Sequence, residues 1–154
     1  MNIKKTVTYI TISILILIFT INFGFAKVDG DSMKPKLNNN NILIYTKTKK
    51  SIERFDMIIV KVKKNIMVKR VIGLPGEKIT YLNNKLYING KVVNEPYLNS
   101  VTNDFDLSTI ISNDIIPHNK IFILGDNRLY STDSRTFGLV DVSDIKGKII
   151  KKIF

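Results

Sequence analysis

The sequence predicts a mostly β domain that follows a single N-terminal membrane-spanning helix. Residues 6–26 carry no charged side chain and are rich in Ile, Leu and Phe. The rest of the chain consists of short β-branched runs separated by Asn, Gly and Pro, as is typical of strands and turns. A chain of 154 residues is long enough for one domain of ordinary size and too short for two large ones.

Composition limits the chemistry that the chain can perform. It has no Cys and one His, so disulfide frameworks, thiol nucleophiles and the usual zinc sites lack the side chains that they require. We therefore expect no metal and no cofactor, and any catalysis must use oxygen or amine groups. The formal net charge of +11 would attract anionic lipid headgroups, but it fits a solvated basic exterior equally well.

The apolar run at the N-terminus has the length of one membrane crossing. Residues 6–26 are flanked by lysines, and a helix of roughly 20 residues spans the roughly 30 Å hydrocarbon core. Because lysines precede the run, the positive-inside rule predicts a cytoplasmic segment at residues 1–5 and an extracytoplasmic domain at residues 27–154. The alternative is a cleaved leader, since Gly24-Phe25-Ala26 ends the run in small residues, although the run is long for such a leader.

Seven segments of strand length and β-branched composition follow the apolar run. They comprise residues 42–45, 57–62, 66–72, 78–82, 85–88, 91–93 and 121–124. The connections Asn83-Asn84 and Asn89-Gly90 fit tight hairpin turns, which need positive φ values, so residues 78–93 are predicted to form a meander. Residues 95–118 are polar and unpatterned, which predicts a long loop or a small insertion.

One predicted strand carries two charges among apolar neighbours. Residues 66–72 are apolar on both faces, as in a strand buried on both sides, yet Lys69 and Arg70 lie at the centre. Burial lowers the pKa of a lysine from about 10.4, and a neutral lysine can take the proton of a serine hydroxyl. The alternative is a lysine whose stem covers the core while its amine reaches water. Both charges need compensation, and residues 125–135, dense in Asp, Ser and Arg, form the kind of loop in which sites are built.

Ser32 is the candidate nucleophile. It lies between Gly30, which permits backbone conformations closed to other residues, and Pro35, which stiffens the chain. Such a turn can aim a backbone amide at a developing oxyanion, although Gly-Asp-Ser is also common in ordinary surface turns. His118 has no evident acid nearby to orient it, so a serine–histidine pair is not favoured.

The chain resembles type I signal peptidases, the membrane-anchored serine–lysine proteases of bacteria, and in particular the short single-span kind of Gram-positive organisms. Four blocks match in order: GDSMKPKL at 30–37, RFDMIIV at 54–60, VKRVIGLPG at 68–76 and GDNRLYSTDSRTFG at 125–138. The resemblance implies a mostly β protease domain, a β-sheet or partly open β-barrel, behind one N-terminal transmembrane helix.

The resemblance also implies roles for individual residues. Ser32 would be the nucleophile, and Lys69 the general base that later returns the proton to the leaving amine. Ser131 would bond to the Lys69 amine and orient it. The position two residues before the nucleophile, a serine that donates to the oxyanion in Gram-negative relatives, is Gly30 here. The oxyanion hole should therefore consist of backbone amides, with Ser32 N–H as the first candidate.

Further side chains are implied to support the site. Asp126 would pair with Arg70, which agrees with the partner that a buried arginine requires. Asp133 would pair with Arg135 and brace the same corner, and Met33 would line the site. No pocket residue can be inferred from the sequence, but the family implies Ala or another small residue at the first and third positions before the cut.

The sequence thus predicts a membrane-bound endopeptidase that removes signal peptides from exported preproteins through an acyl-enzyme on Ser32. Its implied partners are signal peptides and membrane lipid; nucleic acid is not expected, because stacking aromatics interleaved with Arg are absent from the sequence. Two alternatives remain. A self-cleaving serine–lysine protease would need its own scissile bond, and Ala26 is the one alanine. A non-catalytic, basic, membrane-anchored binding module would need neither Ser32 nor Lys69.

Overall fold

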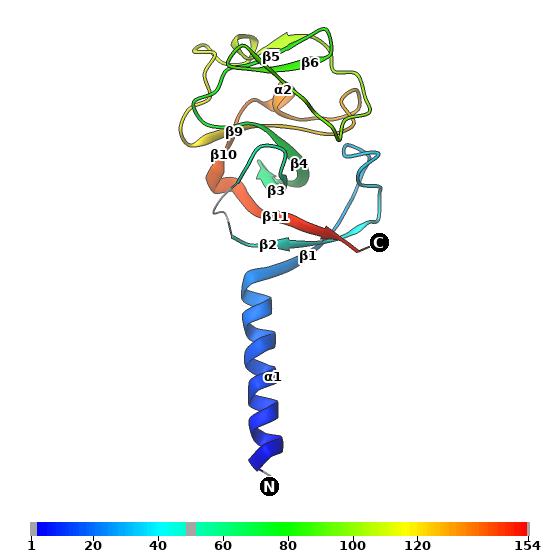
Figure 1. Ribbon diagram of the computed structural model, residues 1–154, viewed down its shortest axis with the longest axis vertical. Coiled ribbons are helices and arrows are strands. Elements are labelled where there is room, and N and C mark those ends of the chain that lie inside the picture. Colours follow the sequence, from blue (N-terminus) through cyan, green and yellow to red (C-terminus); the bar gives the residue numbers. More distant parts are fainter. Residues whose placement is uncertain (1–2, 49–51, 154) are drawn as a thin grey trace.

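One long helix leads directly into a domain built from strands. The computed structural model describes residues 3–48 and 52–153. Helix α1 (Ile3–Asn22) extends away from the domain, and strands β1 (Phe23–Lys27), β2 (Ile42–Thr46) and β11 (Ile145–Lys152) lie nearest to its end (Figure 1). The prediction of a mostly β fold with one N-terminal apolar helix is confirmed.

Helix α1 buries none of its side chains against the domain. Its 20 residues are apolar and numerous enough to cross a membrane, by length and composition. The hydroxyls of Thr8 and Thr11 donate to the carbonyl oxygens of Lys4 and Val7, each across 2.9 Å. These polar side chains are therefore satisfied within the helix, as a lipid environment requires.

The helix begins and ends earlier than predicted. Residues 23–26, which were assigned to the membrane span, belong to strand β1, which pairs antiparallel with β2. The N–H of Lys47 donates to the Asn22 carbonyl oxygen across 2.8 Å, which ties the end of the helix to the sheet. An uncharged apolar run does not reveal this boundary, because the same side chains suit a helix in lipid and a strand on a core. Residues 1–2 of the predicted cytoplasmic segment lie outside the described residues.

Seven strands form one antiparallel sheet in the order β1-β2-β11-β3-β4-β9-β10. The strands not yet given bounds are β3 (Met57–Val62), β4 (Asn65–Gly73), β9 (Lys120–Leu124) and β10 (Val140–Asp141). The pairings found among the described residues leave β1 and β10 as the two edges, so the sheet is open. Strand β11 lies between β2 and β3 but was not predicted, because its lysines break the apolar pattern; Ile145, Gly147 and Ile149 nevertheless alternate onto the buried face.

A second sheet has the order β7-β6-β5-β8. Its strands are β5 (Ile79–Leu82), β6 (Lys85–Ile88), β7 (Lys91–Val93) and β8 (Phe105–Asp106). The predicted meander is confirmed, and its turn residues have the positive φ values expected, from 51° at Asn83 and Asn89 to 76° at Gly90. The predicted loop 95–118 is wrong in part, because it contains β8 and the short helix η1 (Leu107–Thr109).

Strand β4 contributes side chains to all three apolar clusters of the domain. Ile72 packs with residues of the second sheet, Val71 packs with β3 and β9, and Val68 packs against the cluster below the turn between β1 and β2. Its residues from Lys69 to Gly73 are all buried. The predicted two-sided burial of residues 66–72 is confirmed from Lys69 onward and wrong for Ile66, which is 68 % exposed. The two charges of the strand lie where the clusters meet.

Candidate active site

Ser32 lies in the turn between β1 and β2, on top of an apolar cluster. Met33 and Leu37, from the same turn, are buried in that cluster at 2 and 1 % exposure, which fixes the turn to the domain. Gly30 has a φ of +91°, a conformation that favours glycine, and its N–H donates to Asn39 Oδ1 across 3.1 Å. These contacts leave Ser32 half-buried, with its hydroxyl directed at β4.

The side chain of Lys69 reaches Ser32 from the middle of β4. Its Nζ donates to Ser32 Oγ across 2.7 Å, and Lys69 is 3 % exposed. Burial lowers the pKa of Lys69, and Arg135 lowers it further, while Asp133 and Asp126 oppose the shift. Burial is the largest of these effects, so the site favours a neutral amine beside a serine hydroxyl, which is a base next to a nucleophile.

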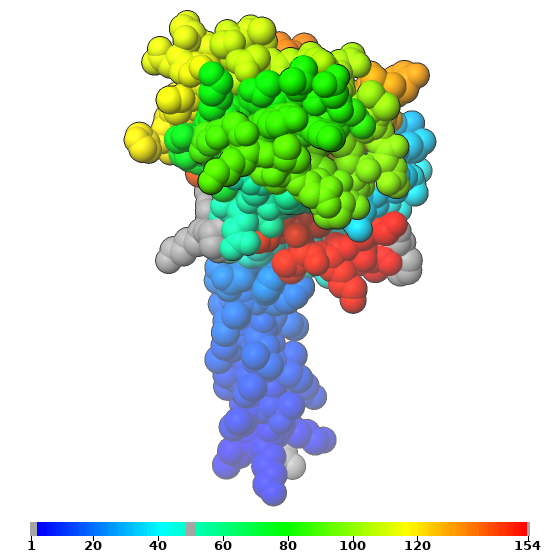
Figure 2. Space-filling view, turned by 45° about the horizontal axis from the view of Figure 1, so that its top comes forward, coloured from blue at the N-terminus to red at the C-terminus, as the bar shows by residue number. Residues whose placement is uncertain are grey.

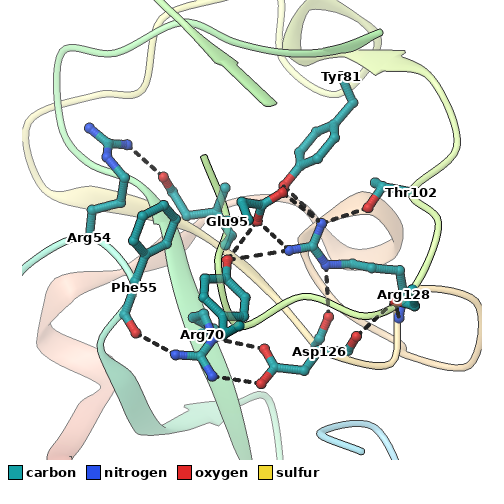
Figure 3. Close-up of polar contacts among 12 residues, drawn as sticks. Arg54, Phe55, Arg70, Tyr81, Glu95, Thr102, Asp126 and Arg128 are labelled. Carbon is teal, nitrogen blue, oxygen red and sulfur yellow. Dashed lines mark hydrogen bonds and ion pairs between the residues drawn. The ribbon is translucent and has the colours of Figure 1, made fainter. Parts of the chain in front are cut away.

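Arg70, the next residue along β4, is compensated by Asp126. Two hydrogen bonds of 2.7 and 2.6 Å join Nε and Nη2 of Arg70 to the carboxylate of Asp126. Nη1 of Arg70 donates to the Phe55 carbonyl oxygen across 2.7 Å (Figure 3). The guanidinium lies 3.8 Å from the centre of the Tyr97 ring. The predicted pair is formed in the bidentate geometry that suits a buried arginine and a carboxylate.

Asp133 and Arg135 brace the corner below Asp126, as predicted. The carboxylate of Asp133 accepts from Nε and Nη2 of Arg135 at 2.9 and 2.8 Å. It also accepts from the N–H of Gly125 across 3.1 Å, and it caps the short helix α2 (Ser134–Phe137). Asp133 is fully buried, and these donors satisfy its carboxylate oxygens.

Ser131 does not make the bond that the sequence predicts. Its Oγ is buried and has no hydrogen-bond partner among the residues that the structure describes, so the contact with the Lys69 amine is absent. The hydroxyl instead packs against the backbone of Gly125, where an added Cβ would lie 2.2 Å from Ser131 Oγ. The prediction was wrong because the position of Ser131 in the sequence, between Asp126 and Asp133, does not determine the direction of its hydroxyl.

The backbone of the turn is held by the loop that follows β9. Asn127 N–H donates to the Ser32 carbonyl oxygen across 3.0 Å, and Asn127 Nδ2 donates to the Asp31 carbonyl oxygen across 3.1 Å. Within residues 3–48 and 52–153 the N–H of Ser32 makes no hydrogen bond. This amide is therefore free to donate to a substrate oxygen.

A small cavity opens beside Ser32. Its volume is about 120 Å³. Its lining comes from β1 and the turn after it, from β3 and from β4, and comprises Ala26, Lys27, Val28, Asp29, Ser32, Met33, Ile59, Ile66, Met67 and Val68. Most of these side chains are apolar. The first strand after the helix therefore supplies one wall of the cavity.

Several residues of this region were not identified from the sequence. Gly125 allows the close approach of the Ser32 carbonyl oxygen, which would lie 2.4 Å from an added Cβ. Glu95, Tyr97 and Arg128 form a buried polar network behind Asp126. The buried charge of Arg128 could be inferred only from the fold, because nothing in its local sequence distinguishes it from a solvated arginine.

His118 is exposed and lies outside the site, in agreement with the prediction that a serine–histidine pair is not favoured. Across the described parts of the chain there is no group of three or more His, Asp or Glu side chains that could hold a metal ion.

Comparison with known proteins agrees with this geometry. The model of the family described as "Signal peptidase, peptidase S26" matches residues 2–154. The chain belongs to this signal peptidase family. It is a serine endopeptidase of the signal peptidase I kind, as the resemblance of the four sequence blocks predicted.

Individual signal peptidases are similar over most of the chain. Signal peptidase I of Bacillus caldolyticus is 46 % identical, over 79 % of this chain and 74 % of that protein. Signal peptidase I V of Bacillus subtilis (strain 168) is 42 % identical, over 80 % of this chain and 81 % of that protein. The crystal structure of a signal peptidase I from Enterococcus faecalis V583 matches with a TM-score of 0.59 and 38 % identity, over 66 % of this chain and 98 % of that one.

Proposed function

We propose that the chain is a membrane-anchored endopeptidase that removes signal peptides from exported preproteins, with Ser32 as nucleophile and Lys69 as general base. The observation that carries this proposal is the 2.7 Å contact between Lys69 Nζ and Ser32 Oγ at a lysine that is 3 % exposed. A lysine in water would be protonated and unable to act as a base, whereas a dry amine is neutral nearer to neutral pH.

The reaction proceeds through an acyl-enzyme. As Ser32 Oγ attacks the scissile carbonyl carbon, its proton passes to the neutral Lys69 amine, and the carbonyl oxygen becomes an oxyanion. Collapse of this intermediate breaks the C–N bond, and Lys69 returns the proton to the leaving amine. Water then attacks the ester with Lys69 again as base, which releases the signal peptide and regenerates Ser32.

The oxyanion is stabilised by the free N–H of Ser32. The turn that contains this amide is held by Gly30 and by the bond from Asn127 N–H to the Ser32 carbonyl oxygen, so the amide is oriented before substrate binds. A donor fixed in advance needs no reorganisation when charge develops. Asp126 and Asp133 support this arrangement through Arg70 and Arg135, and Ser131 fills the space below it.

The small cavity beside Ser32 accepts the side chain that precedes the scissile bond. A volume of about 120 Å³, lined by several apolar side chains, suits alanine or another small residue. Met33 forms its floor, because this side chain is buried in the cluster beneath the turn. The cavity thus accounts for a preference for small residues before the cut, which is a property of signal peptides.

The helix anchors the catalytic domain close to the membrane. Nine residues, 23–31, separate α1 from Ser32, and at about 3.5 Å each they hold the serine within roughly 30 Å of the end of the helix. With residues 1–5 in the cytoplasm, the domain is extracytoplasmic. A substrate whose apolar segment lies in the same bilayer presents its cleavage site at this depth.

Membrane lipid contacts the lower part of the domain. The C-terminal strand, red in Figure 2, lies there, close to the end of the blue helix. Ile150 is 54 % exposed, Phe25 on β1 is 60 % exposed, and Lys151 and Lys152 are exposed beside them. Apolar side chains flanked by lysines suit the boundary between acyl chains and anionic headgroups.

Purified full-length protein and one preprotein test the proposal. In detergent, Ser32→Ala and Lys69→Met are expected to yield no product, while Lys64→Met, a control at an exposed lysine, processes the preprotein normally. Mass analysis should find a new N-terminus after a small residue. Product formation by Lys69→Met would refute the mechanism. Cleavage of the enzyme itself after Ala26 would instead favour the self-cleaving alternative. A preprotein that stays intact with the wild-type protein as well as with every variant would favour a binding module.

A further inference from the structure

A buried ion pair lies behind the proposed catalytic residues. The side chain of Arg128 is 0 % exposed and that of Glu95 is 6 % exposed. Arg128 Nη2 donates to Glu95 Oε1 across 2.5 Å, and Arg128 Nη1 donates to Thr102 Oγ1 and Tyr81 OH at 2.7 and 2.8 Å (Figure 3). A guanidinium removed from water requires a carboxylate, and Glu95 is the one that contacts it within the described parts of the chain.

Two tyrosines fix the carboxylate of Glu95. Tyr97 OH donates to Oε1 across 2.6 Å, and Tyr81 OH donates to Oε2 across 2.8 Å. Burial raises the pKa of both tyrosines, so both remain donors throughout the range in which the protein is folded. With these bonds and those to Arg128, both oxygens of Glu95 are satisfied and the position of Arg128 is defined.

Arg128 in turn holds the loop that touches Ser32. Its Nε donates to the Gly125 carbonyl oxygen across 3.0 Å, and its own carbonyl oxygen accepts from Arg135 Nη2 across 2.7 Å. One residue earlier in the chain, Asn127 N–H donates to the Ser32 carbonyl oxygen. The guanidinium of Arg128 therefore ties the ends of a four-residue loop, residues 125–128, whose middle contacts the nucleophile turn.

The same network reaches Lys69 by a second route. The ring of Tyr97, whose hydroxyl is held by Glu95, lies 3.8 Å from the guanidinium of Arg70, which neighbours Lys69 on β4. Arg70 is also paired with Asp126 of the loop. Displacement of Glu95 would therefore disturb both partners of the proposed Ser32–Lys69 contact.

We propose that Glu95 is a positioning residue for the catalytic pair: its buried carboxylate fixes Arg128, and through Arg128 the loop at residues 125–128 that sets the backbone of Ser32. This inference rests on the proposed function. Glu95 contacts neither Ser32 nor Lys69 and is not among the charges that shift the pKa of Lys69. It acts on the geometry of the pair.

The test compares Glu95→Gln with Glu77→Gln. Glu77 is a matched control, because it also forms a largely buried ion pair with an arginine; its side chain is 15 % exposed and that of Arg54 is 21 % exposed. Glu77 accepts from the N–H of Leu74 in the turn after β4, and within the described residues it makes no hydrogen bond with the loop at residues 125–128. Single-turnover and steady-state cleavage of one preprotein by full-length protein are measured below the unfolding midpoint of each variant. For Glu95→Gln we expect kcat to fall about 10- to 100-fold, as for a displacement near 1 Å. We expect its KM to stay within about twofold of wild type.

For Glu77→Gln, kcat should stay at the wild-type value even where its unfolding midpoint falls. If both variants lose thermal stability and both keep the wild-type kcat when folded, Glu95 is only structural and the inference is overturned. If Glu95→Gln does not fold, Glu95→Asp keeps the charge but withdraws the carboxylate from Arg128; an unchanged kcat there overturns the inference equally. An active Ser32→Ala would refute the proposed function itself, whereas an inactive Ser32→Ala beside a fully active Glu95→Gln refutes only the positioning role.

Discussion

Gly125 has no room for a side chain, which predicts a large loss of activity for Gly125→Ala. An added Cβ would lie 2.2 Å from Ser131 Oγ and 2.4 Å from the Ser32 carbonyl oxygen. Ordinary contact begins at 3.4 Å, so the serine turn or the loop must retreat by about 1 Å. Ser131 can rotate away, but the carbonyl oxygen belongs to the backbone of Ser32, the proposed nucleophile, and can move only with it.

The expected magnitudes follow from this displacement. Forcing an extra carbon into a packed site costs about 1–3 kcal/mol of stability, which in a chain of this size lowers the unfolding midpoint by about 2–4 °C per kcal/mol. A shift of about 1 Å at the reacting atoms lowers kcat about 100-fold. Thermal unfolding followed by circular dichroism measures the first effect, and cleavage of a preprotein by the folded variant measures the second.

Gly76→Ala is the matched control for this prediction. Gly76 has a φ of +83°, so alanine is strained there by about 1–2 kcal/mol, but nothing lies within 4 Å of the added carbon. The two variants should therefore lose similar stability, and only Gly125→Ala should lose kcat. A Gly125→Ala protein that is folded and keeps kcat within about threefold of wild type would show that the close approach to Ser32 does not fix the nucleophile.

Three further predictions concern the buried charges. Activity should rise with pH through the lowered pKa of Lys69, below the ordinary value of 10.5, because the free amine is the proposed active form. Half-maximal activity only at that ordinary value would contradict the burial argument. Lys69→Met should be inactive yet more stable than wild type below the lowered pKa of Lys69, because the unfolded chain binds the lysine proton more tightly than the native chain does. Urea unfolding should show this advantage shrinking as pH rises toward 10.5. Asp126→Asn should lose about 3–5 kcal/mol in guanidinium chloride unfolding, because Arg70 is then buried without its carboxylate, whereas Asp114→Asn, at a more exposed ion pair, should change little.

The local pattern of the sequence was enough to predict the meander and the buried strand. Asn83-Asn84 and Asn89-Gly90 adopt the turn conformations that their residue types favour, because a two-residue hairpin depends only on local backbone energy. The apolar run 66–72 likewise predicted two-sided burial, which the structure has from Lys69 onward. Strand β11 was missed, since its lysines on the exposed face conceal the alternation of the buried face, and which face is buried depends on β2 and β3.

The boundary between helix and strand also required the tertiary structure. Phe23 and Ala26 are as apolar as the helix that precedes them, and only their pairing with β2 ends the helix at Asn22. The strand that results forms a wall of the cavity beside Ser32. A prediction of one continuous span therefore placed residues of the domain in the membrane.

What the sequence by itself determined is the family, and it named the two residues proposed for its chemistry. With no cysteine and one histidine, a lysine in an apolar strand and a serine on a constrained turn were the groups left to act, and their motifs matched one family. Only the tertiary structure decided how these groups are held. Ser131 makes no hydrogen bond to Lys69, Gly125 lies close to the backbone of Ser32, and Glu95 compensates the charge of Arg128. The physical reason is that a buried charge is stabilised by a partner far along the chain, 33 residues away for Arg128 and 56 residues away for Arg70. The sequence around each arginine therefore does not show which carboxylate will pair with it.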